Sequence, residues 1–350
     1  DLSRILAKYY GTPVIDFLRL MLPPKVSTKK ESVYSICSTD KVISSRAFNQ
    51  KQVFEFIINN GNVTVNDISE NLKITISSIR SALTALTKKG IIKREYRVIR
   101  RKPMIISGEN NNGHINLTLE QQNAVATITE GFRNAKKTTL IYGVTGSGKT
   151  EVYIRAIERV LNKGKNALIL VPEISLTPQM LSIFRRRFPG KTAVIHSRLS
   201  PGERFDEWQR ISSGEASVVL GARSAIFSPI QDLGMIIIDE EHETSYKNGE
   251  HPYYDARTVA KFRAKKQDAM LVLGSATPSV ESFYRVAKGE YSLVKLTKRV
   301  SGRPLPKLEI IDMKEELKSG NRHIFSRKLL YGMKEALERQ KQVILFLNRR

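Results

Sequence analysis

The sequence contains a single cysteine, Cys37, among its 350 residues. One thiol excludes an intramolecular disulfide framework and a zinc site built from cysteines alone. No apolar run reaches the roughly 18 residues that a membrane-spanning helix needs, and no signal peptide opens the chain. These absences predict a soluble protein of a reducing compartment, the cytoplasm.

Acidic residues are scarce: 34 Asp and Glu stand against 58 Lys and Arg, for a net charge of +24. A field of this sign attracts polyanions, nucleic acid above all, although a solubilising surface is the alternative explanation. Hydrophobic residues make up 41% of the chain, which excludes wholesale disorder. The basic residues also cluster in short segments, at Lys93–Lys102, Arg185–Arg187 and Arg263–Lys266.

The length predicts two to three domains of about 100–200 residues each. Because the chain starts at Asp1 and stops at Arg350 directly after an apolar run, we expect a fragment cut at both ends. Residues 4–21 predict two short amphipathic helices broken at Gly11 and Pro13. The stretch over 25–45 shows only weak strand character.

Residues 46–101 follow the order of a winged helix: helices near 53–60, 64–72 and 75–89, then a basic strand pair over 91–99. The third helix is the predicted recognition helix, although a winged helix that only packs against protein is the alternative. It would expose three small hydroxyl side chains and one cation toward DNA: Ser77, Ser78, Arg80 and Ser81.

A polar linker over 102–114 precedes a different pattern, in which apolar strand-like runs alternate with helices. This alternation predicts a parallel α/β sheet with helices on both faces, a RecA-like P-loop lobe over 115–312. The six predicted strands lie at 138–142, 167–171, 192–195, 217–220, 235–239 and 270–273.

The segment GVTGSGKT at Gly143–Thr150 follows the first of these strands and opens a helix, as a phosphate-binding loop requires. Its glycines allow backbone N–H groups to surround phosphate oxygens, and the helix N-terminus adds partial positive charge. Lys149 is predicted to neutralise the β- and γ-phosphates, and the Thr150 hydroxyl to bind Mg²⁺. The remaining predicted nucleotide contacts are Gly143, Thr145, Gly146, Ser147 and Gly148.

The second predicted half of the site is IIIDEEH, in which three carboxylates follow a buried strand. Carboxylates at a strand end repel each other unless a cation is present. Asp239 is therefore predicted to bind Mg²⁺, and Glu240 to polarise the attacking water. Glu241 and His242 are predicted to couple the site to its neighbours. Among these, a lone histidine is also typical of a residue that only hydrogen-bonds to the site.

The segment LGSATPS at Leu273–Ser279 places Ser275 and Thr277 at another strand end. These hydroxyls either bridge the Mg²⁺ site to the next lobe or form a plain turn. Together with the two motifs above, further segments make the chain resemble superfamily 2 helicases, and among them the replication-restart helicases. They are LTLEQQNAV (Leu117–Val125), VPEISLTPQ (Val171–Gln179), HSRLSPGERFDEWQ (His196–Gln209), GARSAIFSP (Gly221–Pro229) and ILFLNRR (Ile344–Arg350).

This resemblance implies that Gln121 reads the adenine base and that Arg223 contacts single-stranded DNA. It further implies that the segment SYKNGEHPYYDAR (Ser245–Arg257) is an aromatic-rich loop that couples DNA contact to ATP hydrolysis. The bases would stack on its rings, and its cations would contact phosphate; a loop that packs on its own domain is the alternative. The residues concerned are Tyr246, His251, Tyr253 and Tyr254 for stacking, and Lys247 and Arg257 for phosphate.

By the same resemblance, residues 1–45 end a domain that captures a 3′ DNA end, and 313–350 open a second motor lobe. ATP and Mg²⁺ are the implied cofactors, with Zn²⁺ bound only by a module beyond Arg350. The implied partners are forked and single-stranded DNA, single-strand-binding protein and primosome proteins near the bacterial nucleoid. Because an arginine finger is missing, we expect this chain alone to hydrolyse ATP very slowly.

Two other functions fit the same residues. One is a duplex DNA translocase of superfamily 2. The other is a winged-helix regulator whose P-loop lobe senses nucleotide. A restart helicase prefers branched DNA over any base sequence, whereas a regulator shows the reverse preference.

Overall fold

The structure is a computed structural model that describes residues 1–23, 30–37, 47–98, 116–131, 137–300, 302 and 307–347. The chain divides into two compact units, Asp1–Ser301 and Gly302–Arg350. The predicted linker over 102–114, part of the segment over 25–45, the basic residues at 100–102 and the last residues of the C-terminal motif at 348–350 lie outside the described residues. Among the described helices, none is long and apolar enough to cross a membrane.

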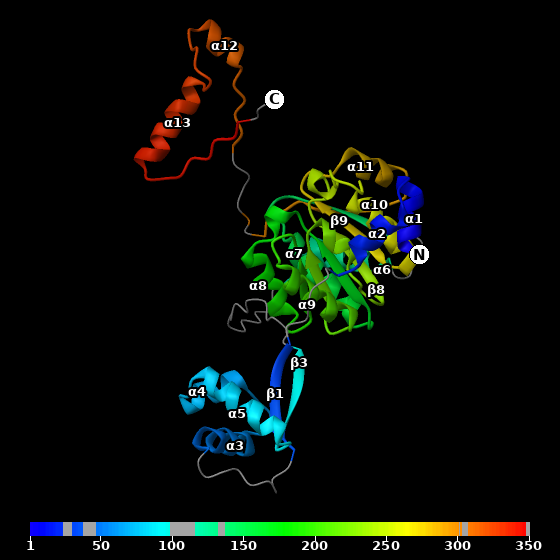
Figure 1. The fold of residues 1–350 in the computed structure, drawn as a ribbon. Helices are drawn as coiled ribbons and strands as arrows, with labels where there is room; N and C mark the ends of the chain where they lie inside the picture. Colours follow the sequence, from blue (N-terminus) through cyan, green and yellow to red (C-terminus); the bar gives the residue numbers. More distant parts are fainter. Residues whose placement is uncertain are drawn as a thin grey trace. The chain divides into compact units, whose positions relative to one another are not determined.

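A seven-stranded sheet forms the centre of the larger unit, in the order β10-β4-β9-β8-β5-β7-β6, and all of its strand pairs are parallel (Figure 1). The six predicted strands are confirmed. The seventh, β10, escaped prediction because Ser292 and Lys295 interrupt its short apolar run. The strands are β4 (Thr138–Gly143), β5 (Asn166–Leu170), β6 (Thr192–Ile195), β7 (Val218–Gly221), β8 (Leu233–Ile238), β9 (Met270–Ser275) and β10 (Ser292–Leu296).

Helices cover both faces of this sheet, which confirms the predicted fold class. Successive residues of β5 alternate between two cores: Leu168 and Leu170 point into one, and Ala167 and Ile169 into the other. One core is completed by α6 (Leu119–Glu130), α7 (Lys149–Leu161) and α8 (Pro178–Arg187). The other contains α9 (Pro201–Ser212), the 3₁₀ helix η2 (Arg223–Phe227) and α10 (Ala256–Gln267).

The parallel arrangement brings the carboxyl ends of the strands to one edge of the sheet, where ligands bind in open α/β folds. The phosphate-binding loop follows β4, Asp239 follows β8, and Thr277 lies just beyond β9. The edge therefore collects the three motifs that the sequence singled out, although they are far apart along the chain.

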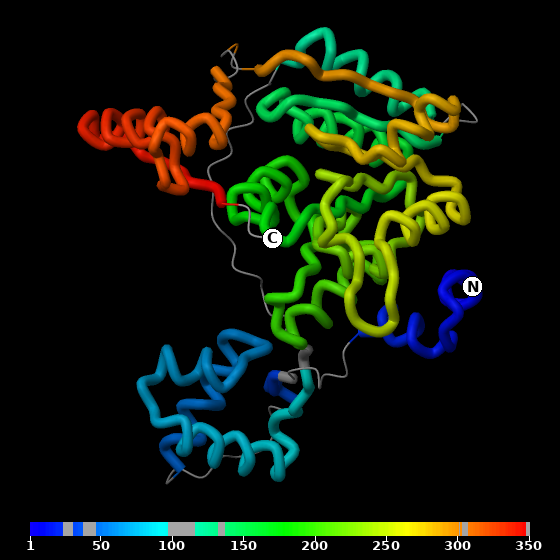
Figure 2. The backbone as a smooth tube through the Cα atoms, turned by 90° about the horizontal axis from the view of Figure 1, so that it is seen from above, coloured from blue at the N-terminus to red at the C-terminus, as the bar shows by residue number. Residues whose placement is uncertain are grey.

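The predicted N-terminal helices are present as α1 (Leu2–Tyr10) and α2 (Val14–Met21), separated at Gly11, whose φ of 66° suits a glycine. They pack into the second core of the α/β lobe through Leu6 and Phe17, neither of which is exposed. Figure 2 shows them in dark blue beside the yellow-green part of the lobe. The sequence alone did not indicate this docking.

The winged helix has its own core, around Val53, Ile57 and Leu83, within the larger unit. Its helices are α3 (Phe48–Asn60), α4 (Val65–Leu72) and α5 (Ile76–Lys88). The strand pair predicted within 91–99 is wrong: β3 (Ile92–Val98) pairs antiparallel with β1 (Lys30–Ile36), far upstream, and β2 (Val63–Thr64) pairs with the other edge of β1. A strand without a local turn signal finds its partner only in the tertiary fold.

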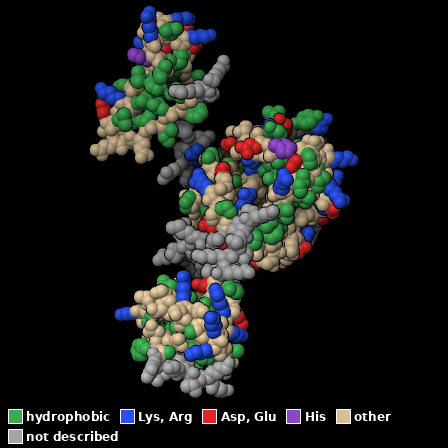
Figure 3. Space-filling model, viewed as in Figure 1, with side chains coloured by type: hydrophobic (Ala, Val, Ile, Leu, Met, Phe, Trp, Pro, Cys, Tyr) green, Lys and Arg blue, Asp and Glu red, His purple; other side chains and the backbone are tan. Residues whose placement is uncertain are grey.

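The smaller unit contains α12 (Met313–Lys318) and α13 (Arg327–Glu338). Residues 341–347 at its apolar end have no regular structure, and Ile344 and Phe346 are 93% and 89% exposed. A strand needs neighbours to satisfy its backbone, and no described residue pairs with this segment. Figure 3 shows apolar side chains gathered on the visible face of this unit.

Candidate active site

The phosphate-binding loop joins β4 to α7, as predicted. Gly148 adopts a φ of 80°, which L side chains rarely take. A Cβ at Gly148 would also overlap the Gln121 amide, and a Cβ at Gly143 would come within 2.8 Å of the Ser147 Oγ. The loop therefore depends on these glycines for both its conformation and its close packing.

Lys149 lies at the first turn of α7, and its ammonium has two partners. Nζ donates to the Gly143 carbonyl oxygen at 3.0 Å and lies 3.5 Å from Glu240 Oε1. The first contact is a hydrogen bond to a neutral acceptor and the second is a loose ion pair, so an incoming phosphate can replace both. Lys149 is thus brought next to the carboxylates after β8, as the sequence predicted.

The loop contains a buried hydroxyl that has no hydrogen-bond partner, the Oγ of Ser147. Such a group costs free energy unless a ligand or water satisfies it. Ser147 directly precedes Gly148, the N-cap of α7, and a helix N-terminus is an environment that anions favour. The donor set of this loop therefore fits a phosphate chain.

Asp239 directly follows β8 and is held by two tyrosines. Tyr153 of α7 donates its Oη to Asp239 Oδ1 at 2.8 Å, and Tyr246 donates to the Asp239 carbonyl oxygen at 2.5 Å. Burial raises the pKa of the Asp239 carboxyl, and the Tyr153 hydrogen bond opposes this rise. Tyr153 was not among the predicted site residues; its place four residues after Lys149, on the same face of α7, was the available signal.

The motif after β9 contains a glycine, Gly274, because its neighbours leave no room for a side chain. A Cβ at this position would overlap the Tyr153 hydroxyl and come within 3.4 Å of Asp239 Oδ1. Because the Tyr153 ring is fully buried and cannot swing away, this glycine makes room for the bond between Tyr153 and Asp239. The motif thus contributes space as well as hydroxyl groups.

Glu240 is the residue predicted to polarise water. Its backbone has a φ of 45°, in the left-handed region that non-glycine residues avoid, and strain of this kind is concentrated at functional sites. Its two carboxylate oxygens face Lys149 Nζ at 3.5 Å and His242 Nδ1 at 3.6 Å. Glu240 therefore stands between the phosphate-binding lysine and the next motif.

Glu241 is not directed at the nucleotide edge; it is 2% exposed and organises the start of α11 (Val280–Ala287). Its carboxylate accepts hydrogen bonds from the Ser279 N–H at 2.7 Å, from the Ser279 Oγ at 3.1 Å and from the Ser282 Oγ at 3.0 Å. Glu241 thus joins the motif after β8 to the helix after β9, in keeping with the predicted coupling role.

His242 makes a second connection between these motifs. Its Nδ1 lies 2.7 Å from the Ser275 Oγ, and its Nε2 lies 3.4 Å from the Thr277 Oγ1. The Ser275 Oγ also accepts from the Thr277 N–H at 2.9 Å. The structure therefore brings together three residues that the sequence placed in one coupling group.

Gln121 lies at the start of α6, next to the phosphate-binding loop. Its Oε1 accepts the Thr118 N–H at 2.9 Å in a capping box at the start of α6, and its Nε2 donates to the Ser147 carbonyl oxygen at 2.9 Å. The residue is 3% exposed. Both polar atoms have partners within the chain, and through them the side chain supports the phosphate-binding loop. The contact of Gln121 with an adenine base stays a prediction.

Two tyrosines of the aromatic-rich loop differ from the prediction. Tyr246 and Tyr254 are only 1% and 6% exposed, so neither can stack on a base. Tyr246 anchors the 3₁₀ helix η3 (Thr244–Tyr246) to Asp239, and the Tyr254 ring packs edge-on against Phe227 at 5.1 Å. Tyr253, at 61% exposure, remains available for stacking, as does the exposed His251.

The cations predicted to contact DNA also divide into those with partners within the chain and those that are exposed. Arg257 forms a two-pronged ion pair with Asp255 and donates to the Glu241 carbonyl oxygen at 2.8 Å. Its contact with DNA phosphate stays a prediction. Arg223 donates to the Lys247 carbonyl oxygen at 2.6 Å, which ties η2 to the loop. Lys247 itself is exposed, as are Ser77, Arg80 and Ser81 on α5, while Ser78 is partly buried.

Within the described residues, no group of three or more His, Cys, Asp or Glu side chains is arranged to hold a metal ion. Asp239 and Thr150 stay the residues predicted to bind Mg²⁺. A metal bound at this edge needs further oxygen ligands from the nucleotide, which is how Mg²⁺ binds in most nucleotide sites.

Family models match two parts of the chain: "DEAD/DEAH box helicase" over residues 118–286 and "Winged helix-turn-helix DNA-binding" over 49–93. Among curated proteins, the chain is 45% identical over 309 residues to the replication restart protein PriA of Bacillus subtilis, covering 88% of this chain and 38% of that protein. It is also 45% identical to PriA of Synechocystis, over 77% of this chain and 33% of that protein. The chain thus spans about a third of the length of these relatives.

A solved structure of RecG bound to a three-way DNA junction is 21% identical, covers 64% of this chain and 31% of that one, and has a TM-score of 0.39.

Proposed function

This chain belongs to the family of the replication restart protein PriA, and from that premise we propose that the protein is an ATP-dependent DNA helicase that acts at forked DNA. The chain supplies the nucleotide-binding motor lobe and a winged helix that binds DNA. The observation that carries the proposal is the meeting of Lys149, Glu240 and Asp239 at one sheet edge, beside a phosphate-binding loop with an unsatisfied buried hydroxyl.

The nucleotide would be held by its phosphates in the loop from Gly143 to Thr150. Lys149 would leave the Gly143 carbonyl and Glu240 to bind phosphate oxygens, which frees the Glu240 carboxylate to orient a water molecule. Ser147 would gain the partner that it lacks. Released from Lys149, Glu240 would keep His242 as its neighbour, so the change reaches the motif after β9.

Mg²⁺ fits the chemistry of this edge, because the chain offers a hydroxyl and a carboxylate rather than sulfur or nitrogen. The residues that would hold it are Thr150 and Asp239. When bound, the ion neutralises charge that develops on the phosphates. Tyr153 keeps the Asp239 carboxylate in one orientation through its hydrogen bond. No cluster of His, Cys, Asp or Glu among the described residues could hold Zn²⁺. We propose Zn²⁺ only for a module outside this chain.

DNA is the proposed polymer partner, in both single-stranded and forked form. The net charge of +24 supplies attraction to any phosphate backbone, and Figure 3 shows Lys and Arg side chains over the visible faces of the lobe and of the winged helix. Tyr253, His251 and Lys247 are the exposed contacts of the loop, and Arg80 is the exposed cation of the recognition helix. Single-strand-binding protein and primosome proteins are proposed partners by family, at the nucleoid in the cytoplasm.

The proposal is tested by measuring binding of the chain to forked, single-stranded and blunt duplex DNA, with and without a non-hydrolysable ATP analogue, at two salt concentrations. We expect the fork to bind most tightly, whatever its sequence, with a steep loss of affinity at higher salt. A preference for one base sequence over branched structure would instead identify a regulator. Equal affinity for blunt duplex and fork would favour a duplex translocase.

A further inference from the structure

The N-terminal helices α1 and α2 are packed against the segments that the function assigns to DNA. The Phe17 ring lies 6.5 Å from the ring of Tyr254 in the aromatic-rich loop and 6.4 Å from Phe227 in η2. Trp208 of α9 donates its Nε1 to the Met21 carbonyl oxygen at 3.2 Å. One short helical pair therefore touches all three segments, which lie far apart in sequence.

Two polar contacts hold the aromatic-rich loop at separate points. The Tyr10 Oη accepts the Asp255 N–H at 3.0 Å, where the loop ends and α10 begins. The Asp16 Oδ2 lies 3.0 Å from His251 Nε2, next to the exposed Tyr253. The end and the outer part of the loop are thus both attached to α1 and α2, and Figure 2 shows that the two elements lie side by side.

The Tyr10 contact continues into the catalytic motif. The Asp255 carboxylate binds Arg257 at 2.7 Å, and the Arg257 NH1 donates to the Glu241 carbonyl oxygen at 2.8 Å. Glu241 is two residues from Asp239. A chain of three direct contacts therefore runs from α1 to the carboxylate motif of the nucleotide site, through a residue that the active-site chemistry does not itself use.

We propose that Tyr10 is a positioning residue for ATP hydrolysis: with Asp16, it fixes the aromatic-rich loop so that DNA contact at the loop reaches Glu241 through Asp255 and Arg257. The inference rests on the proposed helicase function. Its physical content is preorganisation, since a loop already held in one arrangement loses less freedom when it binds DNA. Residues 1–22 thereby serve as a brace on the motor lobe.

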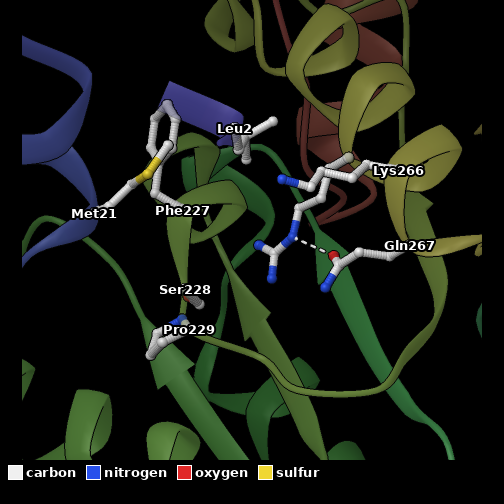
Figure 4. A pocket seen from close by; sticks show the side chains of 8 residues that line it. Leu2, Met21, Phe227, Ser228, Pro229, Lys266 and Gln267 are labelled. Atoms are coloured by element: carbon white, nitrogen blue, oxygen red, sulfur yellow. Dashed lines mark hydrogen bonds between the residues drawn. The ribbon is translucent and has the colours of Figure 1, made fainter. Parts of the chain in front are cut away.

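A cavity of about 310 Å³ lies where α1 and α2 meet η2 and α10, lined by Leu2, Met21, Phe227 and Lys266 among others (Figure 4). Phe227 therefore borders this cavity and also contacts the rings of Phe17 and Tyr254.

The test compares Tyr10→Phe with Tyr9→Phe, a matched loss of one hydroxyl from the neighbouring and exposed ring of the same helix. Hydrogen exchange of the chain is measured over residues 247–257. We expect Tyr10→Phe to raise exchange of the Asp255 amide about fivefold, as for the loss of one hydrogen bond, with no change for Tyr9→Phe. Asp16→Ala should raise exchange around His251 instead.

A second measurement is made on the natural protein in its longest form that contains Tyr10 and the aromatic-rich loop. Tyr10→Phe should lower the DNA-stimulated turnover of ATP by about 2- to 30-fold and leave the turnover without DNA and the KM for ATP unchanged. If amide hydrogen exchange over residues 247–257 is unchanged in both Tyr10→Phe and Asp16→Ala, the proposal that residues 1–22 hold the loop is wrong. If hydrogen exchange becomes faster but DNA stimulates the turnover of ATP as in the parent, the proposal that Tyr10 couples DNA contact to ATP hydrolysis is wrong. If the parent protein itself shows no response to DNA, the proposed function fails, while the exchange result still stands.

Discussion

The phosphate-binding edge and the aromatic-rich loop are both functional regions, but their side chains are held in opposite ways. At the edge, Lys149 rests on a carbonyl and a loose ion pair, and the Ser147 hydroxyl has no partner. In the loop, Tyr246 and Arg257 are bonded to the chain at 2.5 and 2.8 Å. Polar groups at the edge are thus weakly held or without a partner, whereas Tyr246 and Arg257 of the loop are fixed by the chain itself.

The difference teaches that residue type alone does not identify a DNA contact. Tyr253 and Tyr254 are neighbours with identical side chains, yet they are 61% and 6% exposed. One faces solvent and can stack on a base; the other is part of the aromatic cluster with Phe17 and Phe227. Variants that affect only the phosphate-binding edge or only the aromatic-rich loop test this difference.

The largest effect is expected from Lys149→Ala at the edge. Loss of the ammonium removes a charge-assisted contact to phosphate, so we expect affinity for a fluorescent ATP analogue to fall at least about 100-fold. Affinity for forked DNA should remain nearly unchanged. Lys163→Ala, an exposed lysine just beyond the same helix, is the control and should retain both activities. Loss of both activities in Lys149→Ala would mean that the lobe had misfolded or that the phosphate site lies elsewhere.

Tyr254→Ala should destabilise the lobe, since it removes a buried ring that contacts Phe17 and Phe227. We expect the free energy of unfolding, measured in urea, to fall by about 3–5 kcal/mol, as for other large aromatic truncations. Tyr253→Ala should change it by less than about 0.5 kcal/mol. Similar losses for the two variants would erase the distinction drawn between these neighbours.

Tyr253→Ala should act on DNA instead. A stacked base contributes about 1–3 kcal/mol, so affinity for single-stranded DNA, followed by fluorescence anisotropy, should fall by about 5- to 150-fold. Tyr253→Phe keeps the ring and should retain most of the affinity. An unchanged affinity in Tyr253→Ala would show that no base rests on this loop.

The smallest effect concerns the pH dependence of stability at Asp239. Because burial raises the pKa of this carboxyl, the folded state holds its proton more tightly than the unfolded state does. Ionisation therefore removes stability as the pH rises from the ordinary pKa of Asp through the raised value. Asp239→Asn should have a higher Tm than the parent at pH 7.5, and the gain should vanish at acid pH, below the usual range of about 3.9.

The exposed Glu250→Gln serves as the control for this variant and should leave Tm unchanged at both pH values. If Asp239→Asn instead has a lower Tm than the parent at pH 7.5, the ionised Asp239 carboxylate stabilises the fold despite its burial, and the prediction is wrong.

Much of the α/β lobe was predictable because its strands are short, continuous apolar runs separated by helical patterns. The phosphate-binding loop was predictable for a similar reason: its eight residues are consecutive, so their spacing is fixed by covalent geometry. The same holds for Asp239 and Glu240, which directly follow a buried strand. Local order along the chain is sufficient in such cases.

The pairing of β1 with β3 was not predictable, since more than fifty residues separate the two strands. Nor were the internal contacts of Gln121, Tyr246, Tyr254 and Arg257, which the sequence assigned to ligands. Burial and hydrogen bonding depend on what packs against a side chain, and a residue's own segment does not contain that information.

The order of amino acids by itself determined the loop from Gly143 to Thr150 and the carboxylates that follow β8, because those groups are set by short consecutive segments at strand ends. Only the tertiary structure decided which tyrosines and arginines have partners within the chain, and that Tyr10 and Phe17 hold the aromatic-rich loop. The reason is physical: exposure and partnership arise when distant segments compete for the same space, and that competition takes place only in the folded chain.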